Sequence, residues 1–224
     1  SGSAPNIDHS ALFSYFKYGY VPAPKSIQGG IKQLNPGHYV SISLNNGFPL
    51  LDSLISKAWW DSKQRAQELS ANINQSINQQ EYLQRLESIL QLAINQQSQS
   101  EVPLGTFLSG GIDSSLVASL LQDKCSSKIN TFTISFPDNI STENSFNEGP
   151  FAKAISKYLG TNHTDVSLTS EDAQSIIPNI ASFYSEPFAD SSQIPTYLVC
   201  REARKSGLTV AMTGDGGDEL FGGY

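Results

Sequence analysis

Two glycines, three serines and one carboxylate stand together at residues 109 to 115 of the stretch FLSGGIDSSLVASLL, residues 107 to 121. The stretch begins apolar, like a buried strand, and ends with apolar residues at helical spacing. Glycines at such a junction permit a turn with positive φ and let a ligand approach the backbone. The N–H groups of the turn and of the helix that follows can then hold an anion. The hydroxyls of Ser109, Ser114 and Ser115 add further donors.

An anion site alone does not explain Asp113, which lies inside this loop. A carboxylate repels a bound phosphate unless a divalent cation lies between them, and Mg²⁺ takes oxygen ligands of this kind. The alternative is structural, with a sharp glycine turn and either Asp113 or Ser114 capping the helix. Neither the GxxxxGK(S/T) nor the GxGxxG phosphate motif occurs in the chain. The loop therefore predicts a phosphate and magnesium site of another type.

Carboxylates gather again in TGDGGDELFGGY, residues 213 to 224. This loop follows an apolar segment and places Asp215, Asp218 and Glu219 within five residues. Such a density of charge beside a buried strand is costly unless the acids meet a cation or hydrogen-bond donors. A solvated acidic loop is the alternative interpretation.

From residue 101 onward, strand patterns alternate with helix patterns. The alternation predicts an α/β fold, with a parallel sheet covered by helices on both faces. Ligands of such sheets bind beyond the carboxyl ends of the strands, where both loops lie. The expected strands are VPLGTFL (102 to 108), INTFTISF (129 to 136), HTDVSL (163 to 168) and LTVAMT (208 to 213), and the expected helices carry Leu116 to Leu121, Phe151 to Leu159, residues 171 to 184 with a break at Pro178, and residues 192 to 206.

The first 60 residues predict a small α+β segment. Asp8 and Gly19 bound an expected helix, HYVSISL (38 to 44) alternates like a half-buried strand, and Asn45 to Gly47 signal a hairpin. The polar residues 61 to 78 indicate a linker. A helical apolar face within residues 79 to 97 opens the main domain, which we expect to extend from 79 to 224.

Composition restricts the function further. The formal net charge of −7 gives no basic surface for nucleic acid or an anionic membrane. Cys125 and Cys200 are interpreted as reduced cysteines, and the chain contains neither a signal-peptide pattern nor an apolar run of membrane-spanning length. We expect a cytoplasmic protein.

The motif SGGxDSS, at residues 109 to 115, resembles the pyrophosphate loop of the N-type ATP pyrophosphatases, which cleave ATP between its α and β phosphates. The second loop is similar to the SG(D/E)GxDE(L/V)FGGY motif of the synthetase domain of asparagine synthetases and of their β-lactam synthetase relatives. YVPAPKSI and GGIKQLNPGHYV resemble the stretch that joins the glutaminase and synthetase halves of that family. The resemblance implies a fragment: residues 1 to 60 as the tail of the glutaminase half, then a truncated nucleotide alpha hydrolase-like domain.

The resemblance implies ATP and Mg²⁺ as cofactors. Asp113 and Asp218 would share the Mg²⁺, and Asp215 would orient the acceptor or assist the attack of ammonia. Asp215 stands where the family usually has Glu. The remaining expected nucleotide contacts are Phe107 and Ile134 beside the adenine, Ser109, Gly110, Gly111, Ser114 and Ser115 at the phosphates, and Thr213 and Gly214 through the second loop.

The function implied by the resemblance is a glutamine-dependent, asparagine synthetase-like amidotransferase. It would activate aspartate or a related carboxylate as an acyl-AMP, release pyrophosphate and form an amide with ammonia. Many relatives carry Arg near the position of Ser191, so amidation of a sugar carboxylate in surface-polysaccharide pathways and β-lactam-type closure remain alternatives. A non-catalytic ATP-binding module is a third interpretation, and a homodimer of the parent protein is left open. We expect neither glutamine hydrolysis nor full turnover from this fragment.

Overall fold

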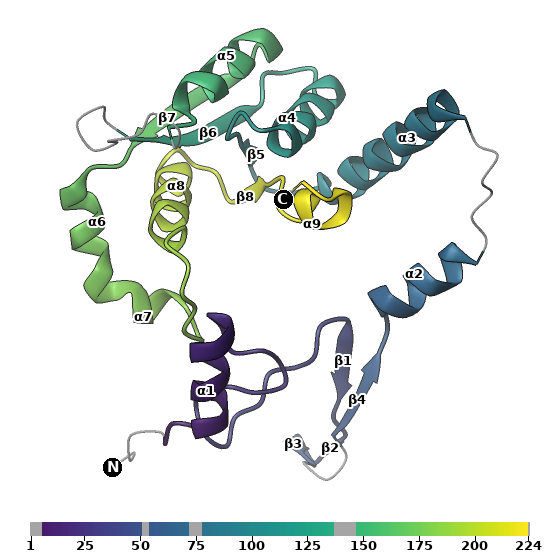
Figure 1. The fold of residues 1–224 in the computed structure, drawn as a ribbon, viewed down its shortest axis with the longest axis vertical. Coiled ribbons are helices and arrows are strands. Elements are labelled where there is room, and N and C mark those ends of the chain that lie inside the picture. The colour runs from purple at the N-terminus through teal and green to yellow at the C-terminus, as the bar shows by residue number, and fades with distance from the viewer. Residues whose placement is uncertain (1–5, 51–53, 72–77, 137–146, 224) are drawn as a thin grey trace. The chain divides into compact units, whose positions relative to one another are not determined.

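The computed structural model describes residues 6–50, 54–71, 78–136 and 147–223 (Figure 1). The chain divides into two compact units. The first comprises residues 1–77 together with 180–190, and the second comprises residues 78–179 together with 191–224. Within the described ranges, no helix combines the length and the apolarity needed to cross a membrane.

The second unit is built on a parallel sheet of four strands in the order β7-β6-β5-β8. The first strand of this sheet along the chain is β5, and the next two, β6 and β7, follow in order on one side of it. The last strand, β8, pairs with β5 on its other side. This reversal makes the carboxyl ends of β5 and β8 a topological switch point, where open α/β sheets bind ligands. The strands are β5 (Leu104–Phe107), β6 (Asn130–Ser135), β7 (Asn162–Ser167) and β8 (Val210–Met212).

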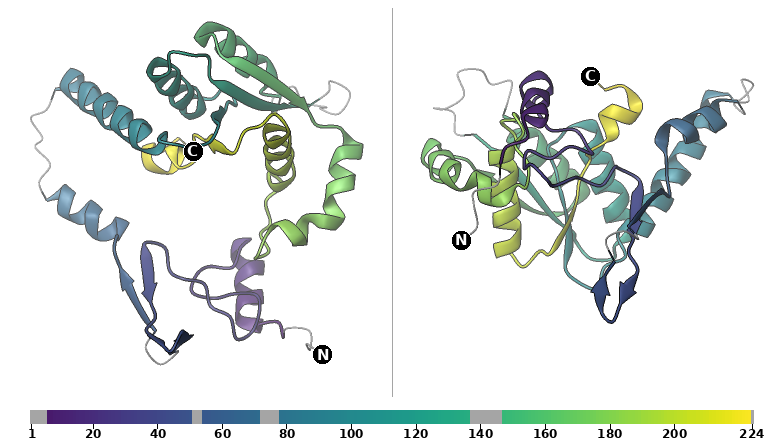
Figure 2. Two further views of the ribbon diagram at one scale, coloured as in Figure 1. Left: turned by 180° about the vertical axis from the view of Figure 1, so that it is seen from behind. Right: turned by 90° about the horizontal axis from the view of Figure 1, so that it is seen from below.

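Helices cover both faces of this sheet, as predicted (Figures 1 and 2). On one face, Ile94 of α3 and Leu121 of α4 pack with Met212 of the sheet. On the other face, Val199 of α8 packs against Phe132. The helices of the second unit are α3 (Gln79–Gln97), α4 (Ile112–Lys124), α5 (Gly149–Leu159), α6 (Ser170–Ile176), α8 (Gln193–Lys205) and α9 (Gly217–Phe221).

Only part of the apolar stripe predicted on α5 lies on the buried face of that helix. Phe151 is 66% exposed and Tyr158 is 89% exposed. The buried positions of α5 are small: Ala152 packs with Ala118 of α4, and Ser156 is also buried. Small side chains leave room for α5 to approach α4 closely, which a pattern of large apolar residues cannot reveal.

The first unit begins with α1 (His9–Tyr18), whose ends are as predicted. The carboxylate of Asp8 accepts bonds from the backbone N–H groups of Ser10 (2.8 Å) and Ala11 (3.0 Å), and Gly19 ends the helix with φ +79°. The unit also contains β1 (His38–Ser41), β2 (Leu44–Asn45), β3 (Phe48–Pro49), β4 (Ile55–Ala58), α2 (Ser62–Ser70) and α7 (Ile180–Phe183).

The predicted hairpin joins β2 and β3 through Asn46 and Gly47, both with positive φ. HYVSISL does not form one half-buried strand, however. β1 ends at Ser41 and pairs with β4, and only His38 of β1 is partly covered. Because its other three residues are exposed, the alternation in the sequence does not correspond to a buried face. The expected linker contains α2, which Asp61 caps through the N–H groups of Lys63 and Gln64.

The predicted helix over residues 171 to 184 is interrupted as expected. α6 ends at Ile176, the residues around Pro178 form a short 3₁₀ turn (Ile177–Asn179), and α7 follows. The segment after α7 contacts the amino-terminal part of the first unit. There the Glu186 carboxylate accepts a bond from the Ser26 hydroxyl (2.5 Å) and another from the Ile27 N–H (2.7 Å).

Candidate functional site

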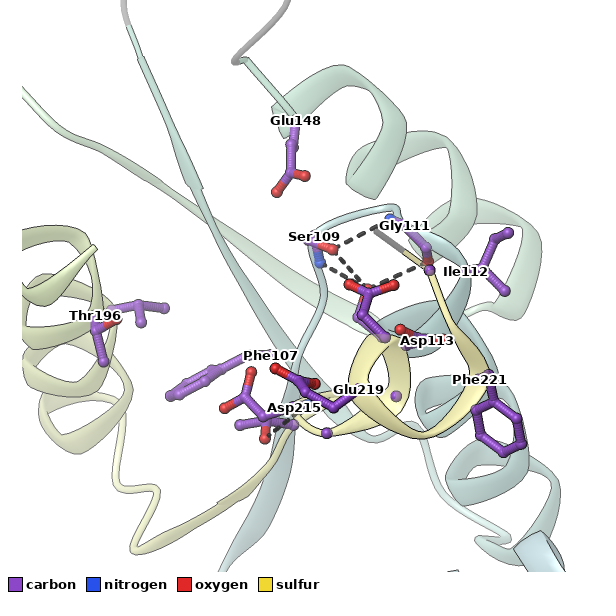
Figure 3. A pocket seen from close by; sticks show the side chains of 18 residues that line it. Phe107, Ser109, Gly111, Ile112, Asp113, Glu148, Thr196, Asp215, Glu219 and Phe221 are labelled. Atoms are coloured by element: carbon purple, nitrogen blue, oxygen red, sulfur yellow. Dashed lines mark hydrogen bonds between the residues drawn. The ribbon is translucent and has the colours of Figure 1, made fainter. Parts of the chain in front are cut away.

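A cavity of about 770 Å³ lies at the carboxyl end of the sheet in the second unit. Its walls come from the loop after β5 and the loop after β8, with further residues from the start of α5 and from α8 (Figure 3). The volume falls within the range of about 300–1,000 Å³ that is usual for small-molecule sites. The two loops singled out in the sequence therefore meet in one pocket.

The loop after β5 is organised by its own serines. Ser114 Oγ accepts a bond from the Ser109 N–H (3.1 Å) and lies 2.8 Å from Ser109 Oγ, which accepts a bond from the Gly111 N–H (3.1 Å). The cap residue of α4 is Gly111, and it has no side-chain capping bond. The capping interpretation of Asp113 and Ser114 is therefore wrong. These hydrogen bonds of the serines hold the loop in one conformation.

Gly110 in this loop has φ +90°, and a Cβ added there would lie 2.7 Å from both Ala152 N and Phe151 Cβ of α5. Only glycine fits that backbone and that space. The loop is thus held against α5 on one side.

The loop after β8 packs on the other side of the first loop. A Cβ on Gly214 would lie 2.7 Å from Ser114 N, and a Cβ on Gly217 would overlap the Asp113 carboxylate. Gly216, with φ +90°, turns the chain into α9, which carries Asp218. The carboxylate of the first loop therefore lies directly against the backbone of the second.

The structure brings most of the predicted site residues together. Ile134 lies in an adjoining cavity that it shares with Phe107. Gly110 and Ser115 are not among the residues that line the main cavity, and Ser115 Oγ donates instead to the Gly111 carbonyl (2.6 Å). The predicted residues that line the main cavity are Phe107, Ser109, Gly111, Asp113, Ser114, Thr213, Gly214, Asp215 and Asp218.

The charge of this cavity is strongly negative. Five of its lining side chains are carboxylates, and its described lining includes no Lys, Arg or His. No set of three or more His, Cys, Asp or Glu side chains suited to a metal occurs within the described ranges. Mg²⁺ commonly takes only one or two protein carboxylates and draws its other ligands from phosphate and water. The cavity therefore fits a phosphate that arrives with a cation better than a free anion.

Two polar lining residues, Glu148 and Thr196, were not named by the sequence reasoning as site residues, and Glu219 was noted only as a member of the acidic loop, without a role of its own. Glu148 lies directly before α5, and its carboxylate points into the pocket (Figure 3). Partial burial disfavours its charged form and raises its pKa. Its position after a predicted strand and just before a predicted helix could have indicated a site residue. The sequence of residues 138 to 150 is interpreted more simply as a surface loop, however.

Comparison with known proteins places this chain in a family. The family model described as asparagine synthase matches residues 85–224. The chain therefore belongs to the asparagine synthase family.

Two relatives match nearly the whole chain. It is 31% identical over 220 residues to a protein provisionally named asparagine synthetase (glutamine-hydrolysing) 2 from Methanocaldococcus jannaschii, covering 98% of this chain and 39% of that protein. It is 30% identical over 219 residues to asparagine synthetase (glutamine-hydrolysing) 1 from Bacillus subtilis, covering 97% of this chain and 31% of that protein. The chain thus spans between 31 and 39% of the length of these two relatives.

Among solved structures, an NH₃-dependent NAD synthetase from Campylobacter jejuni matches with 20% identity and a TM-score of 0.38. The match covers 66% of this chain and 62% of that chain. The fold assignment here is defined by the strand order and the parallel register described above.

Proposed function

We propose that this chain is the nucleotide-binding part of a glutamine-dependent amide ligase that cleaves ATP to AMP and pyrophosphate. The observation that carries the proposal is the packing of the Asp113 carboxylate against Gly217 in the main cavity. That contact unites the two loops whose motifs are similar to those of asparagine synthetases.

The proposed role of each residue follows from the chemistry of its side chain or backbone. Ser109, Ser114 and the backbone of their loop would bind the β and γ phosphates at the start of α4. Asp113 and Asp218 would hold Mg²⁺, which supplies a positive charge against the phosphates when bound. Phe107 would lie against the adenine.

The reaction would proceed in two steps. A carboxylate oxygen of the acceptor forms a bond to the α phosphorus of ATP, and the bond between that phosphorus and the β-phosphate oxygen breaks to release pyrophosphate. The nitrogen of ammonia then forms a bond to the acyl carbon, AMP leaves, and one proton of the nitrogen must be removed. Asp215, which lines the cavity, would accept that proton or orient the acceptor. Its side chain is one methylene shorter than the Glu usual in the family.

Pyrophosphate release by the whole protein tests this proposal. With ATP, Mg²⁺, ammonia and the correct acceptor, pyrophosphate and AMP should form in equal amounts. Aspartate and uronic acids are the first acceptors to compare, because Ser191 stands where many relatives carry Arg. AMP formation with uronic acids alone would favour sugar amidation. Tight binding of Mg·ATP with no pyrophosphate release for any acceptor, β-lactam precursors included, would favour a non-catalytic module.

A further inference from the structure

We propose that Glu148 is a nucleobase-specificity residue, which accepts a hydrogen bond from the exocyclic amine of adenine. The inference rests on the proposed function, because it assigns the purine to the cavity that adjoins the phosphate loops. It concerns a residue that neither loop motif contains.

The observation behind it is a second, smaller cavity of about 290 Å³ that shares Phe107, Ser109, Glu148, Thr196 and Val199 with the main one. Its size, at the lower end of the range for ligand pockets, suits a part of a ligand rather than a whole nucleotide. Because the two cavities share these five lining residues, a nucleotide whose phosphates lie against the loops would have its base within reach of the smaller space.

The wall of the smaller cavity is mainly apolar. A flat, largely apolar ring is the kind of group that such a wall accepts. Its polar side chains are those of Ser109, Thr133, Glu148 and Thr196, and its apolar lining consists of Phe107, Leu108, Phe132, Ile134, Phe136, Pro195 and Val199.

Glu148 is the one ionisable side chain among the described residues that line this smaller cavity. A carboxylate accepts hydrogen bonds and cannot donate them when ionised. It therefore favours a ring with an outward N–H₂ group and disfavours one with a carbonyl oxygen at the same position. Adenine carries the amine, whereas hypoxanthine carries the carbonyl.

Burial supports this role as well. The pKa of Glu148 is raised because its charged form is partly desolvated at the cavity. A donor supplied by the ligand would restore part of the lost solvation. A carboxylate that faced only water would gain less from such a donor.

Binding of Mg·ATP and Mg·ITP, measured by calorimetry on the 224-residue chain, tests the inference. ITP keeps the sugar and phosphates but replaces the amine with a carbonyl. A hydrogen bond to a charged group predicts that the wild-type chain binds ATP about tenfold more tightly than ITP. Glu148→Gln should bring the two affinities within about threefold of each other, because the amide can donate to the carbonyl. Glu171→Gln, on α6 and outside both cavities, is the matched control and should keep the tenfold preference.

A second measurement needs no variant. The triphosphate of purine riboside, which lacks the amine, should bind the wild-type chain about tenfold less tightly than ATP. Equal binding of this analogue and ATP, or an unchanged ATP preference in Glu148→Gln, would overturn the role of Glu148 and leave the proposed function standing. Failure of the wild-type chain to bind Mg·ATP at all would instead overturn the proposed function, and this inference with it.

Discussion

The carboxylate of Asp113 lies against the backbone of Gly217, at the point where any other residue would place its Cβ. This contact joins loops that are about a hundred residues apart in the sequence and that follow neighbouring strands of the sheet. The position of the proposed metal ligand therefore depends on a residue that has no side chain.

Replacing Gly217 with Ala should displace the Asp113 carboxylate and weaken Mg·ATP binding about tenfold. The free energy of unfolding should change by less than about 1 kcal/mol, because the short side chain of Asp113 can move aside and Ala favours a helix more than Gly does. Calorimetry and urea unfolding check the two parts. Leu220→Ala, which removes an exposed side chain from the same helix, should leave Mg·ATP affinity unchanged. Wild-type affinity in Gly217→Ala would contradict the proposed coupling between the loops.

Ser114→Ala should destabilise the second unit more than Ser115→Ala does. Ser114 is buried, and its hydroxyl accepts the Ser109 N–H, so its removal leaves that donor unsatisfied and costs about 1–2 kcal/mol. Ser115 donates to an exposed carbonyl and should cost less than about 1 kcal/mol. Urea unfolding of both variants decides the order. Equal losses would mean that the serine contacts do not organise the loop.

His163 should make stability depend on pH near neutrality. Its Nδ1 lies 2.9 Å from Thr131 Oγ1, and its Nε2 is buried without a hydrogen-bond partner within the described residues. Desolvation by burial lowers its pKa, although Asp165 opposes that shift and Lys153 adds to it. Because the folded state binds the proton less well than the unfolded state, stability is present above the unfolded pKa of about 6.5 and is lost as pH falls below it.

The free energy of unfolding should accordingly be lower at pH 5.5 than at pH 7.5 in urea titrations, and His163→Gln should reduce the difference. A difference of the same size in His163→Gln would assign the pH dependence to other groups.

Glu186→Gln should loosen the contact between residues 180–190 and the amino-terminal segment. The carboxylate accepts one bond on each oxygen, from Ser26 and Ile27, whereas an amide offers a single acceptor oxygen. We expect faster hydrogen exchange at the Ile27 amide, by about tenfold, while the amides of α1 keep their protection. Unchanged exchange at Ile27 would show that the carboxylate is not the group that protects this amide.

The sequence was sufficient for elements that depend on local signals. The strand and helix alternation after residue 101, the ends of α1 at Asp8 and Gly19, and the break at Pro178 follow from spacing, capping and glycine or proline chemistry. The two loops could be placed at one edge because the carboxyl ends of parallel strands share an edge.

Contacts between distant segments could not be predicted in this way. Ala152 and Ser156, rather than Phe151 and Tyr158, face the interior because α4 lies close to α5. The carboxylate of Glu186 binds Ser26 and Ile27, which lie 160 and 159 residues away in the sequence. Periodicity shows which positions lie on one face of a helix or strand, but it does not show which other element packs against that face.

The central claim is that Asp113 and Asp218 hold one shared cation beside the triphosphate, and a double-mutant cycle tests it most directly. Mg·ATP affinity would be measured by calorimetry for the wild type, Asp113→Asn, Asp218→Asn and the double variant. Leu220→Ala serves as the folded control. If both carboxylates bind the same ion, each single substitution should remove most of the Mg²⁺-dependent affinity, and the double variant should be little worse than either one. Losses that simply add, or wild-type affinity in either single variant, would contradict a shared cation.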